Sequence, residues 1–296
     1  MILFKKATGL RNWLDDQRKK GKSIGFVPTM GALHSGHISL IESAKLKNDI
    51  TVCSIFVNPT QFNDPADFEK YPVTIEKDID MLEAAGCDVL FLPSVKEMYP
   101  DGTGRAAPTG QAAWSGQIST RYELGFLETI LEGKFRPGHF QGVCMIVHRL
   151  QEIVLPDDLF LGQKDYQQCM VITKLIELIN LPVTIKVIIC PTLRENDGLA
   201  MSSRNTRLNV VERKTAVTII RVLYMIKEGI QKGSVLPVKN EALQELENAG
   251  FKIDYVAIAD ADDLSAVENW DGKQKLVALV AAFLNEVRLI DNMVLN

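Results

Sequence analysis

The sequence has few of the residues and patterns that mark membrane, secreted or nucleic-acid-binding proteins. Its 296 residues include only four histidines and five cysteines, and the formal net charge is −4. No apolar run approaches the roughly 20 residues of a membrane-spanning helix. The opening stretch carries charges from Lys5 onward, unlike a secretory signal. The negative balance argues against a broad nucleic-acid-binding face. We therefore expect no membrane and no nucleic-acid partner, and any anion-binding site must be local.

The cysteines favour a cytoplasmic location. They are scattered, odd in number and form no CxxC pair: Cys53, Cys87, Cys144, Cys169 and Cys190. Most lie in apolar stretches, where a free thiol behaves as a small core residue. The pattern indicates reduced thiols of a cytoplasmic protein rather than a disulfide framework.

The sequence does contain a regular alternation of short apolar runs and amphipathic stretches. The runs that predict buried strands are 23–29, 50–58, 87–93, 157–162 and 182–190. The stretches with a helical period are 37–48, 75–86, 140–154 and 166–180. Strands filled on both faces that alternate with helices predict an α/β fold, in which a parallel sheet is flanked by crossover helices.

The pattern changes after Cys190. A polar loop is followed by helical stretches and then by apolar runs typical of a small separate sheet, at about 210–232, 237–248, 252–260 and 275–295. We therefore predict two domains, 1–190 with the parallel sheet and 191–296 with a smaller α+β fold. The segment 101–120, rich in Gly, Ala, Thr and Ser, predicts a long loop.

Two of the four histidines, His34 and His37, lie together in "PTMGALHSGH", between a predicted strand and a predicted helix. In an open α/β sheet, ligands bind at the carboxyl ends of strands. A helix N-terminus offers N–H groups and a partial positive charge to an anion, and two imidazoles add donors. The motif predicts a phosphate site. The alternatives are a surface pair of histidines and a zinc site, which would lack an evident third ligand.

Two further motifs carry groups suited to a nucleotide. In "FLGQKDYQQ", Lys164 and Asp165 follow a predicted strand and can serve a phosphate and a hydroxyl. In "GLAMSSRN", Ser202, Ser203 and Arg204 combine two hydroxyls with a forked guanidinium. Taken singly, each motif also fits a solvated turn or an interdomain linker.

A fourth motif, "FVNPTQF", carries amides rather than charges. Asn58 and Gln61 follow a predicted strand, and Gln168 opens a predicted helix elsewhere in the chain. Amides can hold a small polar acid without adding charge, although amides are also common in turns.

The combination resembles the nucleotidyltransferase and class I aminoacyl-tRNA synthetase group, whose HxGH and KMSKS-like signatures hold ATP. The full set of motifs is similar to that of one family, the pantothenate synthetases or pantoate–β-alanine ligases. These motifs are "PTMGALHSGH", "FVNPTQF", "YPVT", "RPGHFQGV", "GQKDYQQ" and "DGLAMSSRN". The likeness covers essentially the whole chain. It implies a Rossmann-like nucleotidyltransferase domain of the HUP type and a C-terminal domain that closes as a lid.

The resemblance implies an ATP-dependent ligase that joins (R)-pantoate to β-alanine. Pantoate is first converted to pantoyl adenylate with release of pyrophosphate, and the amine then displaces AMP. The catalytic residues implied are His37, at the family's proton-donor position, His34, Lys164 and Arg204. The ATP-binding residues implied are Met30, Gly31, Ala32, Leu33, His34, Ser35, Gly36, His37, Gly162, Gln163, Lys164, Asp165, Leu193, Met201, Ser202, Ser203 and Arg204. Gln61 and Gln168 would hold pantoate, and Gln61 would also contact β-alanine.

The resemblance also implies Mg²⁺ and a homodimer. Asp78, which follows "YPVT", is the candidate magnesium ligand, although ATP phosphates and water can hold the ion largely by themselves. Adenylation places charge on the α-phosphate and the leaving pyrophosphate, and each donor aimed at that charge is worth roughly 10²–10³ in rate. His37 would therefore act mainly electrostatically in the first step, because a carboxylate nucleophile needs no base.

Other functions make different predictions. Another HxGH adenylyltransferase, such as a phosphopantetheine adenylyltransferase, tends to be a single short domain and should lack the pair Gln61 and Gln168. A tRNA synthetase is disfavoured by the absence of a basic RNA-binding segment. A nucleotide sensor without catalysis would bind ATP but release no pyrophosphate when pantoate is added.

Overall fold

The structure, a computed structural model, describes residues 1–100, 102 and 121–296. The loop predicted over 101–120 therefore lies outside the described residues, apart from Gly102. Across the described ranges, none of the helices combines the length and apolarity needed to cross a bilayer.

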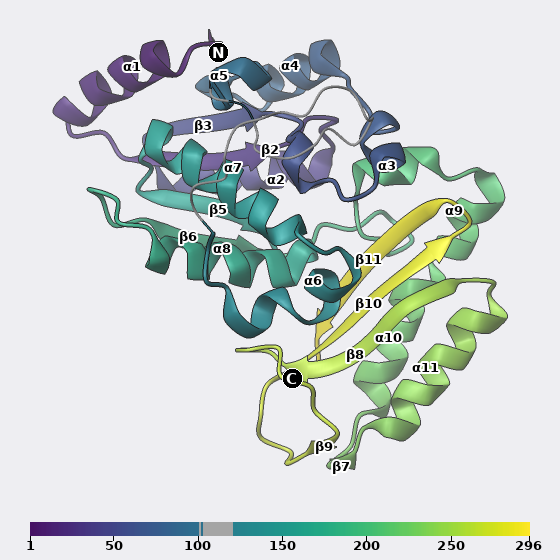
Figure 1. Cartoon of the computed structure of the whole chain (residues 1–296). Coiled ribbons are helices and arrows are strands. Elements are labelled where there is room, and N and C mark those ends of the chain that lie inside the picture. Colours follow the sequence, from purple (N-terminus) through teal and green to yellow (C-terminus); the bar gives the residue numbers. More distant parts are fainter. Residues whose placement is uncertain (101, 103–120) are drawn as a thin grey trace. The chain divides into compact units, whose positions relative to one another are not determined.

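The described chain divides into two compact units, which are coloured along the sequence in Figure 1. The N-terminal unit comprises Met1–Gly162 and Gln168–Cys190. The C-terminal unit comprises Gln163–Gln167 and Pro191–Asn296. The short segment that carries Lys164 therefore belongs to the C-terminal unit, although its chain neighbours on both sides belong to the N-terminal unit.

The N-terminal unit is built on a six-stranded sheet in the order β1-β4-β3-β2-β5-β6, in which every neighbouring pair is parallel. The strands are β1 (Ile2–Phe4), β2 (Ile24–Thr29), β3 (Ile50–Ile55), β4 (Val89–Phe91), β5 (Asp158–Gly162) and β6 (Lys186–Cys190). The predicted parallel α/β fold is confirmed. Strand order reverses between β2 and β5, and ligands bind at the carboxyl ends of strands at such a switch point.

Helices cover both faces of this sheet because successive strand side chains point to opposite sides. One face packs α1 (Ala7–Lys19), α7 (His139–Val154) and α8 (Tyr166–Leu178), and the other packs α2 (Ser35–Lys47) and α4 (Ile75–Ala84). Phe26 and Val27 on β2 illustrate the alternation, since the first belongs to one core and the second to the other.

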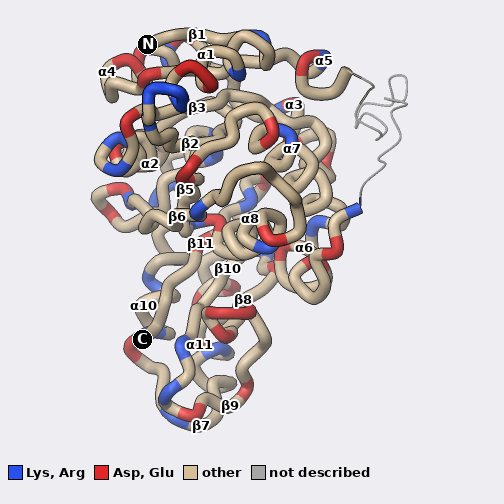
Figure 2. Tube along the Cα trace, turned by 90° about the vertical axis from the view of Figure 1, so that its left-hand side faces the viewer, with Lys and Arg blue, Asp and Glu red and all other residues tan. Residues whose placement is uncertain are grey.

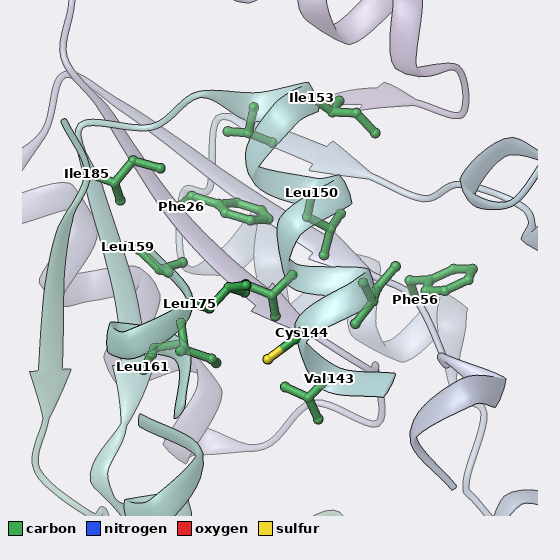
Figure 3. Close-up of a cluster of buried hydrophobic side chains, with 14 of the residues drawn as sticks. Phe26, Phe56, Val143, Cys144, Leu150, Ile153, Leu159, Leu161, Leu175 and Ile185 are labelled. Carbon is green, nitrogen blue, oxygen red and sulfur yellow. The ribbon is translucent and has the colours of Figure 1, made fainter. Parts of the chain in front are cut away.

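Figure 3 shows side chains of α7, including Cys144 and Leu150, in one buried cluster with Phe26 and Leu159 of the sheet. Fully burying a large apolar side chain contributes about 1.5–3 kcal/mol, so this layer contributes strongly to the stability of the unit. The remaining short helices of the unit are η1 (Pro59–Gln61), α3 (Pro65–Glu69), α5 (Val95–Met98), η2 (Gly125–Glu128) and α6 (Leu131–Phe135).

The sequence analysis did not predict β1 or α1. Strand β1 has three residues, too few for a period of two to be visible. Helix α1 buries only Ala7, Leu10 and Leu14, which form a narrow stripe among charged residues. Both elements lie near the start of the given sequence: β1 forms an edge of the sheet beside β4, and α1 packs on the face that α7 also covers.

The C-terminal unit has a three-stranded antiparallel sheet in the order β11-β10-β8, against which α10 and α11 pack. Its elements are η3 (Gln163–Asp165), η4 (Ser203–Arg207), α9 (Val210–Ala216), α10 (Thr218–Gly229), β7 (Gly233–Ser234), α11 (Leu236–Asn248), β8 (Lys252–Asp260), β9 (Asn269–Trp270), β10 (Leu276–Leu284) and β11 (Val287–Val294). The helix predicted over 210–232 is in fact two helices that meet at Val217. Basic and acidic residues are interspersed along each unit (Figure 2).

A buried ion pair joins strand β11 to the loop that precedes η4. Asp291 is 4% exposed, and its two carboxylate oxygens accept from Arg194 at 2.6 and 3.1 Å. Burial raises the pKa of the Asp291 carboxyl, and the hydrogen bonds from Arg194 oppose that shift. A buried charge is costly when it loses its partner, so each member of the pair depends on the other.

We predict that Arg194→Met lowers the free energy of unfolding by about 3–5 kcal/mol, because it leaves Asp291 buried without its countercharge. The double variant Arg194→Met/Asp291→Leu should recover most of that loss, since no charge is then buried. Urea denaturation followed by circular dichroism measures both values. Equal losses in the single and double variants would contradict the account.

Candidate active site

The turn that follows β2 carries both histidines. Strand β2 ends at Thr29, and α2 begins at Ser35 with His34 as its N-cap residue. Between them, Gly31 and Ala32 have φ angles of 80° and 49°. Two successive left-handed residues are uncommon, and only glycine adopts that conformation without strain. The backbone therefore folds back sharply and delivers His34 to the start of the helix.

The two imidazoles cap the helix reciprocally. The Nδ1 of His34 accepts from the backbone N–H of Gly36 at 3.2 Å, and the Nδ1 of His37 accepts from the N–H of His34 at 3.3 Å. The ring centroids are 4.0 Å apart. Because each Nδ1 accepts a hydrogen bond, the proton of each neutral ring resides on Nε2. Both rings thus carry their N–H donor on the side away from the helix backbone.

Gln61, after β3, is tied to this turn. Its Nε2 donates to the Sδ of Met30 at 2.9 Å, and its Oε1 accepts from the Nδ2 of Asn58 at 3.2 Å. Asn58 is buried, and its Oδ1 accepts from the hydroxyl of Tyr99 at 2.8 Å. The network fixes which end of the Gln61 amide donates. Tyr99 belongs to no motif, so the sequence carried no signal for it.

The start of α7 supports the backbone around Gln61. The Nδ1 of His139 lies 2.8 Å from the carbonyl oxygen of Gln61, within hydrogen-bond distance. One turn further, Gly142 packs so closely that a Cβ there would overlap the carbonyl oxygen of Thr60. This explains part of the "RPGHFQGV" motif: its histidine and its second glycine allow α7 to approach η1 directly.

In the C-terminal unit, strand β11 supports the lysine turn. The Nδ2 of Asn292 donates to the carbonyl oxygens of Gln163 and Lys164, both at 2.9 Å. Asn292 is 2% exposed. The Nζ of Lys164 lies 3.6 Å from the Oδ1 of Asp165. Sequence reasoning missed Asn292, because nothing near residue 292 indicates a contact with a turn more than 120 residues earlier.

The loop with Ser202, Ser203 and Arg204 is held by the same strand. Helices η3 and η4 both contact β11, so two motifs that are distant in the sequence meet on one support. Within the loop, the N–H of Met201 donates to the carbonyl oxygen of Leu193 at 3.1 Å. Leu193 is 40% exposed, which leaves an apolar side chain at the surface beside polar residues.

Gly162 and Gln168 lie at the carboxyl edge of the parallel sheet. Gly162 ends β5 and pairs with Cys190, the last residue of β6. Gln168, which is half-buried, lies in the first turn of α8. Parallel strands place their carboxyl ends at one edge, so these residues share that edge of the unit with the histidine turn.

The structure gives the proposed magnesium ligand other partners. Asp78 is fully buried, and its oxygens accept from the N–H groups of Ala32 and Leu33 at 2.9 and 2.8 Å. In the part of the chain that the structure describes, no group of three or more His, Cys, Asp or Glu side chains could hold a metal ion. These contacts do not support Asp78 as a magnesium ligand.

The cysteines offer no nucleophile. All five are free and buried. Burial raises the pKa of the Cys87 thiol to about 11 and that of Cys144 to about 12. Because the thiolate is the reactive form, such thiols are inert at neutral pH.

Comparison with known proteins gives one consistent result. A family model described as Pantoate-beta-alanine ligase matches residues 2–294. A pantothenate synthetase of Cytophaga hutchinsonii is 40% identical, with 100% of this chain and 99% of that protein covered. One of Fervidobacterium nodosum is 44% identical, with 94% and 93% covered.

Solved structures agree. Pantothenate synthetase from Thermus thermophilus is 37% identical, with a TM-score of 0.86 and 99% of each chain covered. Pantoate-beta-alanine ligase from Francisella tularensis, complexed with beta-gamma ATP and beta-alanine, is 37% identical, with a TM-score of 0.78 and 99% and 97% of the chains covered.

We predict that Gly142→Ala lowers the free energy of unfolding by about 1–3 kcal/mol, because the added methyl must displace η1. Gly9→Ala is the matched control, since Gly9 also lies early in a helix and its Cβ would make only an ordinary contact with Phe4. That variant should be neutral or more stable by up to about 1 kcal/mol. Chemical denaturation of both variants is the measurement, and equal stabilities would refute the close approach.

Proposed function

The chain belongs to the pantoate-beta-alanine ligase family, and we propose which of its residues join pantoate to β-alanine with the use of ATP. The observation that carries the proposal is the pair of reciprocally capping imidazoles at the carboxyl end of β2. Their Nε2–H donors, the N-terminus of α2 and the switch point of the sheet all favour a bound polyphosphate.

In the first step, a carboxylate oxygen of pantoate attacks the α-phosphorus of ATP. A P–O bond forms, the bond to the β-phosphate oxygen breaks, and pyrophosphate leaves. His34 and His37 donate to the phosphate oxygens as charge develops on them. No side chain needs to accept a proton, because the nucleophile is already ionised. The residues from Met30 to His37 bind the nucleotide through backbone and side-chain donors.

Further donors come from the segments that β11 supports. Lys164 supplies a positive charge for phosphate and Asp165 an acceptor for a ribose hydroxyl, within the ATP-binding segment from Gly162 to Asp165. Met201, Ser202, Ser203 and Arg204 bind the triphosphate, and the exposed side chain of Leu193 offers the adenine an apolar surface. The shared support on β11 favours a common task for these two segments. Each well-aimed donor contributes roughly 10²–10³ in rate.

Gln61 and Gln168 hold pantoate, and Gln61 also contacts β-alanine. The fixed orientation of the Gln61 amide supports this role, because it presents a defined donor and acceptor. In the second step, the β-alanine amine attacks the acyl carbon, the bond to AMP breaks, and the amine loses a proton. Alignment of the two reactants supplies most of what this step needs, and no covalent enzyme intermediate is involved. The bound beta-alanine of the Francisella tularensis relative supports this substrate.

Magnesium would enter with the nucleotide. The described residues provide no carboxylate cluster for it, so ATP phosphates and water would supply most of its ligands. We predict that calorimetric titration of Mg²⁺ alone shows no binding tighter than about 1 mM, while EDTA abolishes pyrophosphate release in the presence of ATP. Tight binding of Mg²⁺ without ATP would contradict this.

The central experiment is a pyrophosphate-release assay with ATP and pantoate, run with and without β-alanine. A stoichiometric burst without the amine and steady turnover with it would establish both steps. His37→Ala and Lys164→Ala should each lower adenylation about 10²–10³-fold, because each removes a donor to developing charge.

His148→Ala is the matched control for the loss of an imidazole, because His148 lies in α7 and bonds to Tyr122 rather than to the turn. Near-wild-type adenylation by His37→Ala would overturn its role. ATP binding without any pyrophosphate release from the wild-type protein would favour a nucleotide sensor instead.

Three further proposals concern the protein as a whole. The free, buried thiols favour a cytoplasmic location, where cysteines stay reduced. We also propose a homodimer, which light scattering would test. We propose in addition that residues 191–296 close over residues 1–190 as a lid, which small-angle scattering with and without ATP would test. A phosphopantetheine adenylyltransferase is disfavoured, since the family match runs through residue 294.

A further inference from the structure

Asp78 lies in the first turns of α4, and its carboxylate is satisfied entirely from within the protein. Oδ2 accepts from the N–H of Ala32 at 2.9 Å. Oδ1 accepts from the N–H of Leu33 at 2.8 Å and from the hydroxyl of Thr74 at 3.0 Å. The side chain is 0% exposed. A carboxylate near a helix N-terminus is also favoured by the helix dipole.

We propose that Asp78 is a positioning residue that holds the histidine turn in its capping conformation, a role that rests on the proposed function of that turn. Successive N–H groups in a left-handed turn form a concave site that binds anions. Here the turn at Gly31 and Ala32 directs two N–H groups at one carboxylate, which is supplied by the chain itself.

The link to the histidines is short. Leu33 directly precedes His34, the N-cap of α2, and Leu33 is itself buried in the core beside Leu40 and Ile41. Asp78 therefore restrains the backbone one residue before the cap. If Asp78 no longer accepted from Ala32 and Leu33, these two buried N–H groups would lack a partner, which is unfavourable enough to rearrange the turn.

Gly31 is part of the same arrangement. A Cβ on Gly31 would lie 3.1 Å from the Oδ2 of Asp78 and 3.0 Å from the Cγ2 of Ile55. Glycine is therefore favoured at this position for two reasons: the positive φ of the backbone and the close approach of the Asp78 carboxylate. The "PTMGALHSGH" motif and the aspartate after "YPVT" are therefore two parts of one structure.

The test is Asp78→Asn, which keeps the shape of the side chain but turns one acceptor into a donor that faces an N–H group. With only four histidines in the chain, long-range ¹H–¹⁵N spectra can follow each ring. We expect the signals of His34 and His37 to lose the Nε2–H tautomer pattern, while those of His139 and His148 stay unchanged. This readout does not depend on activity.

In the pyrophosphate-release assay, Asp78→Asn should lower kcat of adenylation by about 10²-fold, with a change in the pantoate KM of less than about threefold, because the donors rather than the acid site are displaced. A tenfold increase in Mg²⁺ should not restore activity. Restoration by Mg²⁺ would identify Asp78 as a metal ligand and overturn the proposal.

Asp157→Asn is the control for the loss of a carboxylate that accepts from a backbone N–H; Asp157 is exposed, whereas Asp78 is buried. The Oδ2 of Asp157 accepts from the N–H of Ile24 at 2.7 Å, at the opposite end of the strand that leads into the histidine turn. We expect unchanged histidine signals and unchanged adenylation. An equal loss in this control would reduce Asp78 to a general contributor to stability and overturn the proposal.

Thr74→Val provides a milder variant should Asp78→Asn fail to fold, since it removes only one of the three donors. We expect the same two histidine signals to shift and kcat to fall about threefold to tenfold. Unchanged signals for His34 and His37 in this variant would overturn the proposal. Failure of the wild-type protein to release pyrophosphate would instead refute the proposed function, and the spectra would still report on Asp78.

Discussion

The candidate site depends on one physical constraint: the backbone polar groups of its turns must be satisfied, and buried side chains satisfy them. The turn after β2 meets this requirement with a carboxylate from α4, which accepts from two consecutive N–H groups. The turn after β5 meets it with the Asn292 amide from β11, which donates to two consecutive carbonyl oxygens. In both cases a single buried side chain fixes a turn by holding two adjacent peptide groups.

The two supports have opposite polarity for a physical reason. Gly31 and Ala32 adopt a left-handed turn, whose N–H groups converge and attract an anion. The 3₁₀ turn at Gln163–Asp165 instead leaves carbonyl oxygens to be satisfied, and an amide donor supplies this without a charge. The backbone of Lys164 is therefore held by a neutral group, while its ammonium lies 3.6 Å from the Asp165 carboxylate.

Neutral groups also surround Gln61, which we propose as a pantoate ligand. Gln61 is oriented by Asn58, which in turn bonds to Tyr99, so an uncharged network defines the direction of each amide group. Backbone contact between α7 and η1 makes the arrangement rigid, because Gly142 allows the helix to lie directly on Thr60.

The sequence by itself determined the fold class, because buried runs that alternate with amphipathic stretches are compatible with little other than a parallel α/β sheet. It also drew attention to the candidate site residues, since His34, His37, Lys164 and Arg204 lie in compact motifs at predicted loop positions. The sequence did not predict short or weakly patterned elements. Strand β1 has only three residues, and α1 buries only a narrow stripe of apolar side chains.

Only the tertiary structure decided which residues support those motifs. Asp78 lies 45 positions from Leu33, and Asn292 lies 128 from Lys164, so no local pattern connects them. The structure also assigned the segment Gln163–Gln167 to the C-terminal unit, against the order of the chain. Spacing along a sequence reports which face of an element is buried, but contacts between distant peptide groups arise only when the chain has folded.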